Sequence, residues 1–527
     1  YPETNPPIPI TLEECEDLAE EKGARNGWEL ASRYAAEMLP QIFRNESPVF
    51  RLEIPAEFRI ELESLLNSLP SEVFTASDSL GWVYQFWQSK RKDEINESEV
   101  KIGARELPAV TQLFTEPYMV SFLLDNALGA WWANQCLSSE DLKNAKSEEE
   151  LREKASLEGM PLQYLRFGKN EDGYFLPHTY GGWGKTLKNF KILDPSSGSG
   201  HFLVSLFLML VPLRKKMESL STEEAIDRVI SENLHGLDLD KRVTEISAFA
   251  LALEAWRTPG GGGYRKLPGM NIACTGLSVG VDKKTWLNLA GSNRELFHVL
   301  ELLYDQFEKA PVLGSLINPK ITLDRGDLFQ YKPETYLPIL ERILSNEKDQ
   351  EIIETGVAAR GLSKASVLLT ESYDWVVTNV PYLGRGKQAD TLKEYCAMYY
   401  GDAKNDLATV FLERCLQFCK TGENYGTVSV VLPQNWLFLV SYKKFRVKLL
   451  QEETWNWVAR LGAGGFQTPM WDFNVQLLTL SKHKPVSSDP QEFLFYGLDV
   501  SECNTPIQKA EGLQLQEIKS VEQARQL

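Results

Sequence analysis

A short glycine-rich loop between two apolar segments limits the folds that are open to this chain. The loop runs from Asp194 to Gly200 with the sequence Asp-Pro-Ser-Ser-Gly-Ser-Gly. Residues 190–193 before it have the length of a buried strand, and the apolar run 201–212 after it has the length of a buried helix. A strand, a tight glycine turn and a helix in this order are typical of an open parallel sheet whose first turn holds a nucleotide-like ligand. The loop alone does not identify that ligand, because many doubly wound folds carry one.

Short apolar runs alternate with helical segments along most of the chain, which predicts a doubly wound α/β sheet of seven strands. The strand candidates are residues 190–193, 234–238, 321–323, 375–378, 427–432, 457–461 and 475–480. We expect this domain to cover residues 106–484, with insertions near 260–315 and 331–370. Glutamate-rich amphipathic stretches predict a helical N-terminal domain over 1–105. The polar segment 485–527 is interpreted as a linker or the start of a C-terminal recognition domain.

Carboxylates follow the predicted strands. Asp194 ends the first strand, Asp238 ends the second, and Asp327 follows the third in a segment that continues to Phe329. A carboxylate at the end of the second strand can accept both ribose hydroxyl hydrogens of an adenosine ligand, and Asp327 could accept from the adenine amine. No Lys-Ser or Lys-Thr pair follows the glycines, so a nucleoside triphosphate is disfavoured. A pocket rich in carboxylates also suits a ligand that carries an ammonium and a sulfonium group.

The fourth predicted strand leads into Asn379-Val380-Pro381-Tyr382, which resembles the Asn-Pro-Pro-Tyr motif of amino-methyltransferases. In that family the asparagine side-chain oxygen and the next backbone carbonyl accept the two hydrogens of the adenine amine, and the aromatic ring stacks on the base. The resemblance implies these roles for Asn379, Val380 and Tyr382, with Pro381 completing the catalytic segment. Val380 stands where the family has its first proline. The backbone carbonyl of residue 380 is present whichever side chain the residue carries, and Pro381 still restrains Val380 to extended conformations. We therefore expect the activity to be reduced or altered rather than lost.

Two further segments extend the resemblance. Residues 112–120 are similar to the donor-binding segment that precedes the glycine loop in the gamma order of these enzymes, which implies that Thr115 lines the donor pocket. Residues 461–466 resemble the segment whose phenylalanine packs against the extruded base. This implies base stacking by Phe466, with a place in the core as the alternative. With segments 81–87, 123–129 and 404–407, the chain resembles the large adenine methyltransferases of the BREX (PglX) and DISARM phage-defence systems over residues 75–482.

The resemblance implies a class I methyltransferase fold, Rossmann-like, with S-adenosylmethionine as the cofactor. The implied activity is N6-methylation of adenine in double-stranded DNA by base flipping, as part of phage defence or restriction-modification, with other defence proteins as further partners. The donor-binding residues are then Thr115, Asp194, Pro195, Ser196, Gly198, Gly200, Asp238, Asp327 and Phe329.

The charge and the cysteines limit the partners and the location. A formal net charge of −17 opposes DNA binding over the whole surface, so DNA contacts must be local. The basic runs 90–92 and 443–448 are the candidates, although such a run is more often a solvated helix face. The seven cysteines include no Cys-x-x-Cys pair, which argues against disulfides or a zinc site and fits a reducing cytoplasm. The longest apolar run is about 12 residues, against the roughly 18 that cross a bilayer, so no membrane association is expected.

Two other functions remain open. The substitution at Val380 and the acidic charge would also fit a catalytically weak scaffold that binds S-adenosylmethionine and recognises DNA or partner proteins. Methylation of a protein glutamine uses a similar motif, but the length of the chain and its helical N-terminal region favour DNA.

Overall fold

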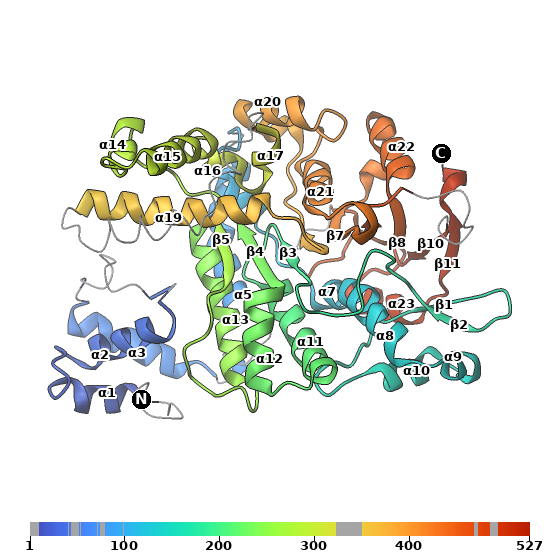
Figure 1. Cartoon of the computed structure of the whole chain (residues 1–527), viewed down its shortest axis with the longest axis horizontal. Helices are drawn as coiled ribbons and strands as arrows, with labels where there is room; N and C mark the ends of the chain where they lie inside the picture. The colour runs from blue at the N-terminus through green and yellow to red at the C-terminus, as the bar shows by residue number, and fades with distance from the viewer. Residues whose placement is uncertain are drawn as a thin grey trace.

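A computed structural model describes residues 10–40, 42–43, 52, 54–70, 72–73, 79–98, 100–322, 350–467, 473–484 and 494–526. A large twisted sheet crosses the molecule, with helices on both of its faces (Figure 1). Its strands are β3 (Ile192–Asp194), β4 (Leu234–Asp238), β5 (Asn271–Cys274), β6 (Trp375–Asn379), β7 (Thr427–Pro433), β8 (Thr454–Gly462), β9 (Val475–Ser481), β10 (Leu494–Asp499) and β11 (Lys519–Glu522).

The strand order is β11-β10-β8-β9-β7-β6-β3-β4-β5. The strands β5, β4, β3, β6 and β7 are parallel neighbours, whereas β9 lies antiparallel between β7 and β8. The seven strands from β5 to β8 form the class I methyltransferase sheet that the sequence predicted. The carboxyl ends of β3, β4 and β6 meet at one edge, where a doubly wound sheet binds its ligand.

The structure corrects two of the predicted segments. The third strand is β5, inside the segment 260–315 that we predicted to be an insertion, and residues 321–322 of the predicted strand belong to helix α17 (Pro319–Thr322). Residues 485–527, predicted to be a linker or the start of a recognition domain, contain β10, α23 (Pro506–Leu515) and β11. Strand β10 pairs in parallel with β8 and β11 pairs with β10, so this segment extends the methyltransferase sheet.

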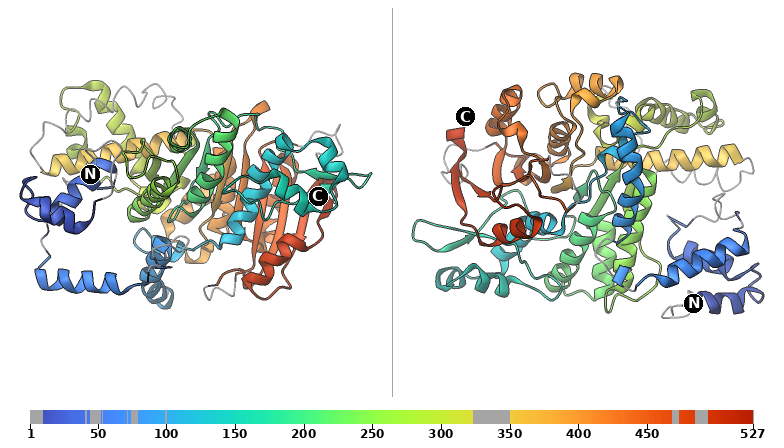
Figure 2. Two further views of the ribbon diagram at one scale, coloured as in Figure 1. Left: turned by 90° about the horizontal axis from the view of Figure 1, so that it is seen from below. Right: turned by 180° about the vertical axis from the view of Figure 1, so that it is seen from behind.

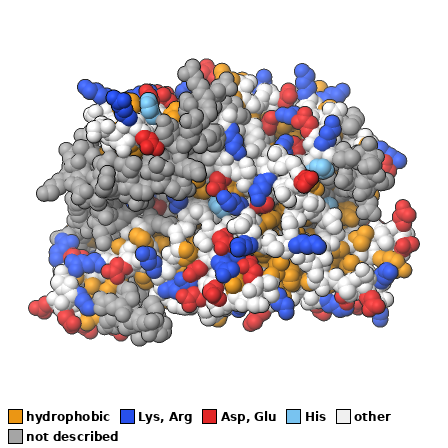
Figure 3. Space-filling view, viewed as in Figure 1, with side chains coloured by type: hydrophobic (Ala, Val, Ile, Leu, Met, Phe, Trp, Pro, Cys, Tyr) orange, Lys and Arg blue, Asp and Glu red, His pale blue; other side chains and the backbone are white. Residues whose placement is uncertain are grey.

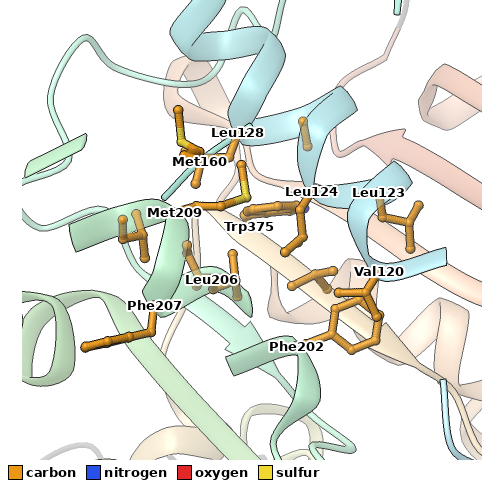
Figure 4. Close-up of a cluster of buried hydrophobic side chains, with 14 of the residues drawn as sticks. Val120, Leu123, Leu124, Leu128, Met160, Phe202, Leu206, Phe207, Met209 and Trp375 are labelled. Carbon is orange, nitrogen blue, oxygen red and sulfur yellow. The ribbon is translucent and has the colours of Figure 1, made fainter. Parts of the chain in front are cut away.

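Helices that cover the two faces of the sheet enclose two hydrophobic cores. On one face lie α7 (Pro117–Leu124), α8 (Ala130–Cys136), α11 (His201–Glu218), α12 (Thr222–Arg228) and α13 (Lys241–Arg257), and on the other lie α15 (Arg294–Phe307), α19 (Gln350–Thr370), α21 (Leu407–Phe418) and α22 (Lys443–Glu452) (Figures 1 and 2). Figure 4 shows side chains of α7 and α11, among them Leu124 and Leu206, packed around Trp375 of β6. Burying these apolar side chains fixes α11, and therefore the glycine loop before it, against the sheet.

The described part of 1–105 is helical, and the boundary near residue 105 stays a prediction. Its helices are α1 (Leu12–Ala19), α2 (Gly27–Met38), α3 (Ala56–Ser68) and α5 (Ser79–Glu97). The remaining α-helices and strands of the described residues are α6 (Leu107–Thr111), α9 (Ser139–Asn144), α10 (Glu148–Ala155), β1 (Phe167–Lys169), β2 (Phe175–Pro177), α14 (Lys283–Asn288), α16 (Ala310–Leu313) and α20 (Asp390–Tyr399). None of the described helices combines the length and the apolar character needed to cross a bilayer.

Candidate active site

The glycine loop between β3 and α11 depends on two glycines in the left-handed region. Gly198 has φ of +52° and Gly200 has φ of +93°. A Cβ on Gly200 would lie 2.6 Å from the Ser247 hydroxyl oxygen on α13, so the loop packs directly on that helix. A Cβ on Gly198 would meet no atom within 4 Å, which leaves that backbone open to a ligand.

Asp194 and Asp238 lie under this loop. Asp238 Oδ2 accepts from the Gly198 backbone N–H at 2.9 Å, and its Oδ1 accepts from the Asp240 N–H at 2.9 Å. Asp194 Oδ1 accepts from the Ser196 N–H at 3.1 Å. Burial raises the pKa of Asp194 to about 7 and that of Asp238 to about 6, because little solvent stabilises either charge. A cationic ligand would stabilise both ionised forms.

Asn379, at the end of β6, makes hydrogen bonds in two directions. Its side-chain Nδ2 donates to the Thr115 hydroxyl at 3.1 Å, and its Oδ1 accepts from the Tyr382 hydroxyl at 2.9 Å. The Val380 backbone N–H donates to the Val431 carbonyl of β7 at 3.3 Å, and the Val380 side chain is only 1% exposed. Burial raises the pKa of Tyr382 well above its usual value, so its hydroxyl stays protonated and can only donate to the amide oxygen.

One cavity joins the two halves of the site, with about 1030 Å³ of empty space including the part open to solvent. The sequence-predicted residues among its lining are Thr115, Pro195, Ser196, Gly198, Asp238, Asn379, Val380 and Pro381. Asp194 and Tyr382 lie directly behind this lining through their hydrogen bonds to Ser196 and Asn379. The donor loop and the Asn379 segment therefore face the same space.

Four further predicted residues are not among the lining of the cavity. Gly200 packs against Ser247 of α13 instead. Asp327 and Phe329 lie outside the described residues. Phe466 does not line the cavity; its side chain is 6% exposed and belongs to the hydrophobic core on the α7 and α11 face. The ring beside Tyr382 is instead Phe473, with 5.6 Å between the ring centroids. The core position that was the alternative for Phe466 is therefore the one it occupies, and base stacking by Phe466 stays a prediction.

The N-terminal region supplies a wall of the cavity that sequence reasoning did not assign. Gly81 and Gln85 of α5 line it, and the Tyr84 hydroxyl donates to Asp240 Oδ2 at 2.7 Å. Phe114 stacks on His201 with 5.2 Å between centroids. The resemblance of residues 81–87 to related enzymes was the signal that could have located this wall.

The polar atoms of the cavity lining fit S-adenosylmethionine. Ser197 Oγ and Gln85 Oε1 are buried and have no hydrogen-bond partner in the described part of the chain, although both residues line the cavity. Buried polar atoms of this kind are costly unless a ligand satisfies them. With the open Gly198 backbone and the buried carboxylates, they fit a polar, positively charged nucleoside.

The chain matches known methyltransferases in sequence. Residues 232–466 match the family of Eco57I restriction-modification methylases. The adenine-specific methyltransferase BrxX of Escherichia coli O9:H4 (strain HS) is 26% identical over 77% of this chain and 33% of its own length. The adenine-specific methyltransferase PglX of Lacticaseibacillus casei (strain Zhang) is 25% identical over 81% of this chain and 34% of its own length.

The chain thus spans about a third of the length of these curated relatives. Among solved structures, a DrdV–DNA complex aligns over 97% of this chain and 43% of its own chain, with 11% identity and a TM-score of 0.47. The sequence matches confirm the predicted resemblance to BREX-type adenine methyltransferases, and they support S-adenosylmethionine as the cofactor.

Proposed function

We propose that this chain carries the catalytic core of a DNA adenine-N6 methyltransferase that marks host DNA in a bacterial phage-defence system of the BREX or DISARM type. The single observation behind this proposal is that Asn379 lines the same cavity as Gly198 and Asp238. A methyl donor in the glycine loop and a base at Asn379 would therefore be within reach of each other. The cytoplasm, where host DNA lies, is the proposed location.

The proposed mechanism uses hydrogen-bond acceptors in place of a general base. Asn379 Oδ1 and the Val380 carbonyl would each accept one hydrogen of the adenine amine, which turns the nitrogen lone pair toward the donor. Bound S-adenosylmethionine would supply an electrophilic methyl group. The amide oxygen has two lone pairs, so it can accept from adenine while it still accepts from Tyr382. Positioning of the two reactants then supplies most of the rate increase, and the surplus proton leaves after transfer.

The substitution at Val380 is compatible with activity. Its N–H bond to Val431 continues the β6–β7 pairing by one residue, and its side chain is buried in the core. These contacts hold the loop in the extended form that a proline would otherwise impose. The substitution at Val380 therefore gives less support to the alternative of a catalytically weak scaffold.

The acceptor must leave the duplex, because the adenine amine cannot reach a donor from inside the stack. Flipping the base costs a few kcal/mol. Stacking on an aromatic ring such as Tyr382 returns about 1 to 3 kcal/mol. The overall charge of −17 does not prevent local DNA contact: Figure 3 shows Lys and Arg side chains interspersed with Asp and Glu over one face.

The test is to sequence host DNA for N6-methyladenine with and without the gene. Loss of methylation at one sequence motif would support the reaction, the substrate and the recognition site together. In parallel, the native protein with its partners is incubated with labelled S-adenosylmethionine and either DNA or protein substrates. Donor binding without transfer to DNA would favour the scaffold, and label in protein would favour glutamine methylation.

A further inference from the structure

Three consecutive apolar side chains are exposed in the loop between β7 and α22. Phe438 is 60% exposed, Leu439 is 50% exposed and Val440 is 85% exposed. Single apolar residues on a surface are ordinary, but a contiguous group of large ones marks an interaction site. We call residues 438–440 the apolar tip.

The apolar tip is held rigidly. Trp436 and Tyr442, on either side of it, are buried in the core. The Arg446 guanidinium Nη1 donates to the carbonyls of Trp436 at 2.6 Å and Leu439 at 2.7 Å, which ties the loop to α22. A loop fixed at both ends loses little further entropy when it binds, so its exposed side chains are presented ready for contact.

The apolar tip lies on the acceptor side of the candidate active site. Asn379 pairs with Val431 in the β6–β7 register, two residues before β7 ends at Pro433. The next residue, Gln434, donates its N–H to the Asn474 carbonyl at 2.8 Å. The neighbour of Asn474 is Phe473, whose ring packs on Tyr382. The apolar tip therefore follows β7 at the same edge of the sheet at which β6 ends in the Asn379 segment.

Positive charge follows directly after the apolar tip. Lys443 and Lys444 begin α22, are exposed and form no ion pair with any described residue, whereas Lys448 pairs with Glu413 at 2.7 Å. These are the first residues of the basic run that the sequence singled out for DNA. In the other run, Lys92 instead donates to the Gln112 carbonyl at 3.1 Å. An apolar group beside free ammonium groups is complementary to a base step flanked by phosphates.

We propose that the apolar tip is a wedge that enters duplex DNA beside the target adenine, while Lys443 and Lys444 contact the adjacent phosphates. This inference rests on the proposed function. Flipping one base unstacks its neighbours, and apolar side chains inserted at that step stabilise the opened duplex by covering the bases left exposed. The wedge thus lowers the cost of base flipping without touching the donor.

The wedge is tested with a triple variant, Phe438→Ser, Leu439→Ser and Val440→Ser, in the native protein with its partners. The control is Leu515→Ser, which removes another exposed apolar side chain, at the end of α23 on the opposite side of the sheet from α22 (Figures 1 and 2). Two duplexes carry the methylation motif found in host DNA. In one the target adenine is paired, and in the other it faces an abasic site and is already easy to flip.

The triple variant should lose at least about tenfold in kcat/KM on the paired duplex and less than about threefold on the abasic duplex, while Leu515→Ser matches the native protein on both. Equal losses on the two duplexes, or no loss, would overturn the wedge. Normal methylation combined with loss of a co-purifying defence protein would also overturn it, in favour of a protein-binding role.

Failure of the proposed function gives a different result. In that case the native protein methylates neither duplex, including the one whose adenine is easy to flip. The wedge is then judged without turnover, from the fluorescence of 2-aminopurine placed at the target position. A fluorescence change that the native protein causes on binding and the triple variant does not would support the wedge. Equal changes with both proteins would overturn it.

Discussion

The Asn379 side-chain amide donates to the Thr115 hydroxyl across a distance of 3.1 Å. Thr115 precedes α7, in the segment that resembles the donor-binding part of gamma-class enzymes, whereas Asn379 ends β6 in the acceptor segment. Together with the Tyr382 hydroxyl, this bond fixes which way the amide points. The residue proposed to bind adenine is therefore oriented by a residue proposed to line the donor pocket.

Thr115→Val removes the acceptor for the Asn379 Nδ2 while it preserves the size of the side chain. The amide should then be less firmly oriented, and we expect kcat on DNA to fall about tenfold, the effect of losing one hydrogen bond of about 1.4 kcal/mol. Methyl transfer at saturating substrate measures this. Thr115→Ser keeps the hydroxyl and should restore most of the rate; a serine variant as slow as the valine variant would contradict the role of the bond.

Substitutions in the two halves of the site should affect methylation and donor binding separately. Asn379→Ala should abolish methylation and leave donor affinity within about threefold of native, because the glycine loop and the carboxylate of Asp238 that are proposed to bind the donor remain in place. Asp238→Ala should weaken donor binding at least about tenfold through loss of the carboxylate that accepts from the Gly198 N–H and faces the cavity. Titration calorimetry with S-adenosylmethionine measures the donor affinity of both variants, and a methylation assay measures their turnover. Normal turnover by Asn379→Ala would rule out the acceptor assignment.

Donor affinity should fall as the pH is lowered. Both buried carboxylates are ionised only above their raised pKa values, about 7 for Asp194 and about 6 for Asp238. A cationic donor binds the ionised forms better, so binding is strongest above about pH 8 and weakens through the range from 7 to 6, approaching tenfold per pH unit for each carboxylate. Calorimetry over this range measures the change. Asp238→Asn should flatten the pH profile of donor affinity near pH 6. An unchanged profile would contradict the proposed role of Asp238 in donor binding.

The two loop glycines should respond differently to alanine. Gly200→Ala combines a φ of +93° with a Cβ only 2.6 Å from Ser247 Oγ, so we expect a loss of about 1–3 kcal/mol in the free energy of unfolding. The added Cβ of Gly198→Ala meets no atom within 4 Å, so the free energy of unfolding should change by only about 1 kcal/mol. Its methyl group would instead obstruct the donor and reduce affinity at least about tenfold. Thermal unfolding and donor titration of the two variants check this contrast.

Long apolar runs with clear ends made most of the sheet predictable. Strand β5 was missed because its apolar part is only Ile272–Ala273–Cys274, too short for periodicity to distinguish it from the equally short segment 321–323. The segment 321–323 that replaced it in our prediction begins inside α17. There the Asn318 side chain accepts from the Lys320 N–H and Pro319 starts the helix, a common way for helices to begin.

Motifs singled out residues that mostly line one cavity, but they did not indicate the contacts between those residues. The Thr115–Asn379 bond joins segments far apart in the chain, and no local pattern encodes it. Phe466 and Phe473 both follow β8 closely in the sequence, and only the three-dimensional structure shows that the second one reaches Tyr382. Strand β10 escaped detection because it is only partly buried, so its apolar alternation is weak.

The pairing of β10 with β8 also bears on how the protein behaves when shortened. The register from Tyr496–Trp457 to Asp499–Arg460 uses the backbone groups along the outer side of β8. Without residues 494–526 those amide and carbonyl groups would face solvent as a bare strand edge, which is a template for strands of other molecules. Fragments that stop at residue 484 should therefore self-associate and precipitate, whereas fragments that keep β10 should remain monodisperse at the same concentration.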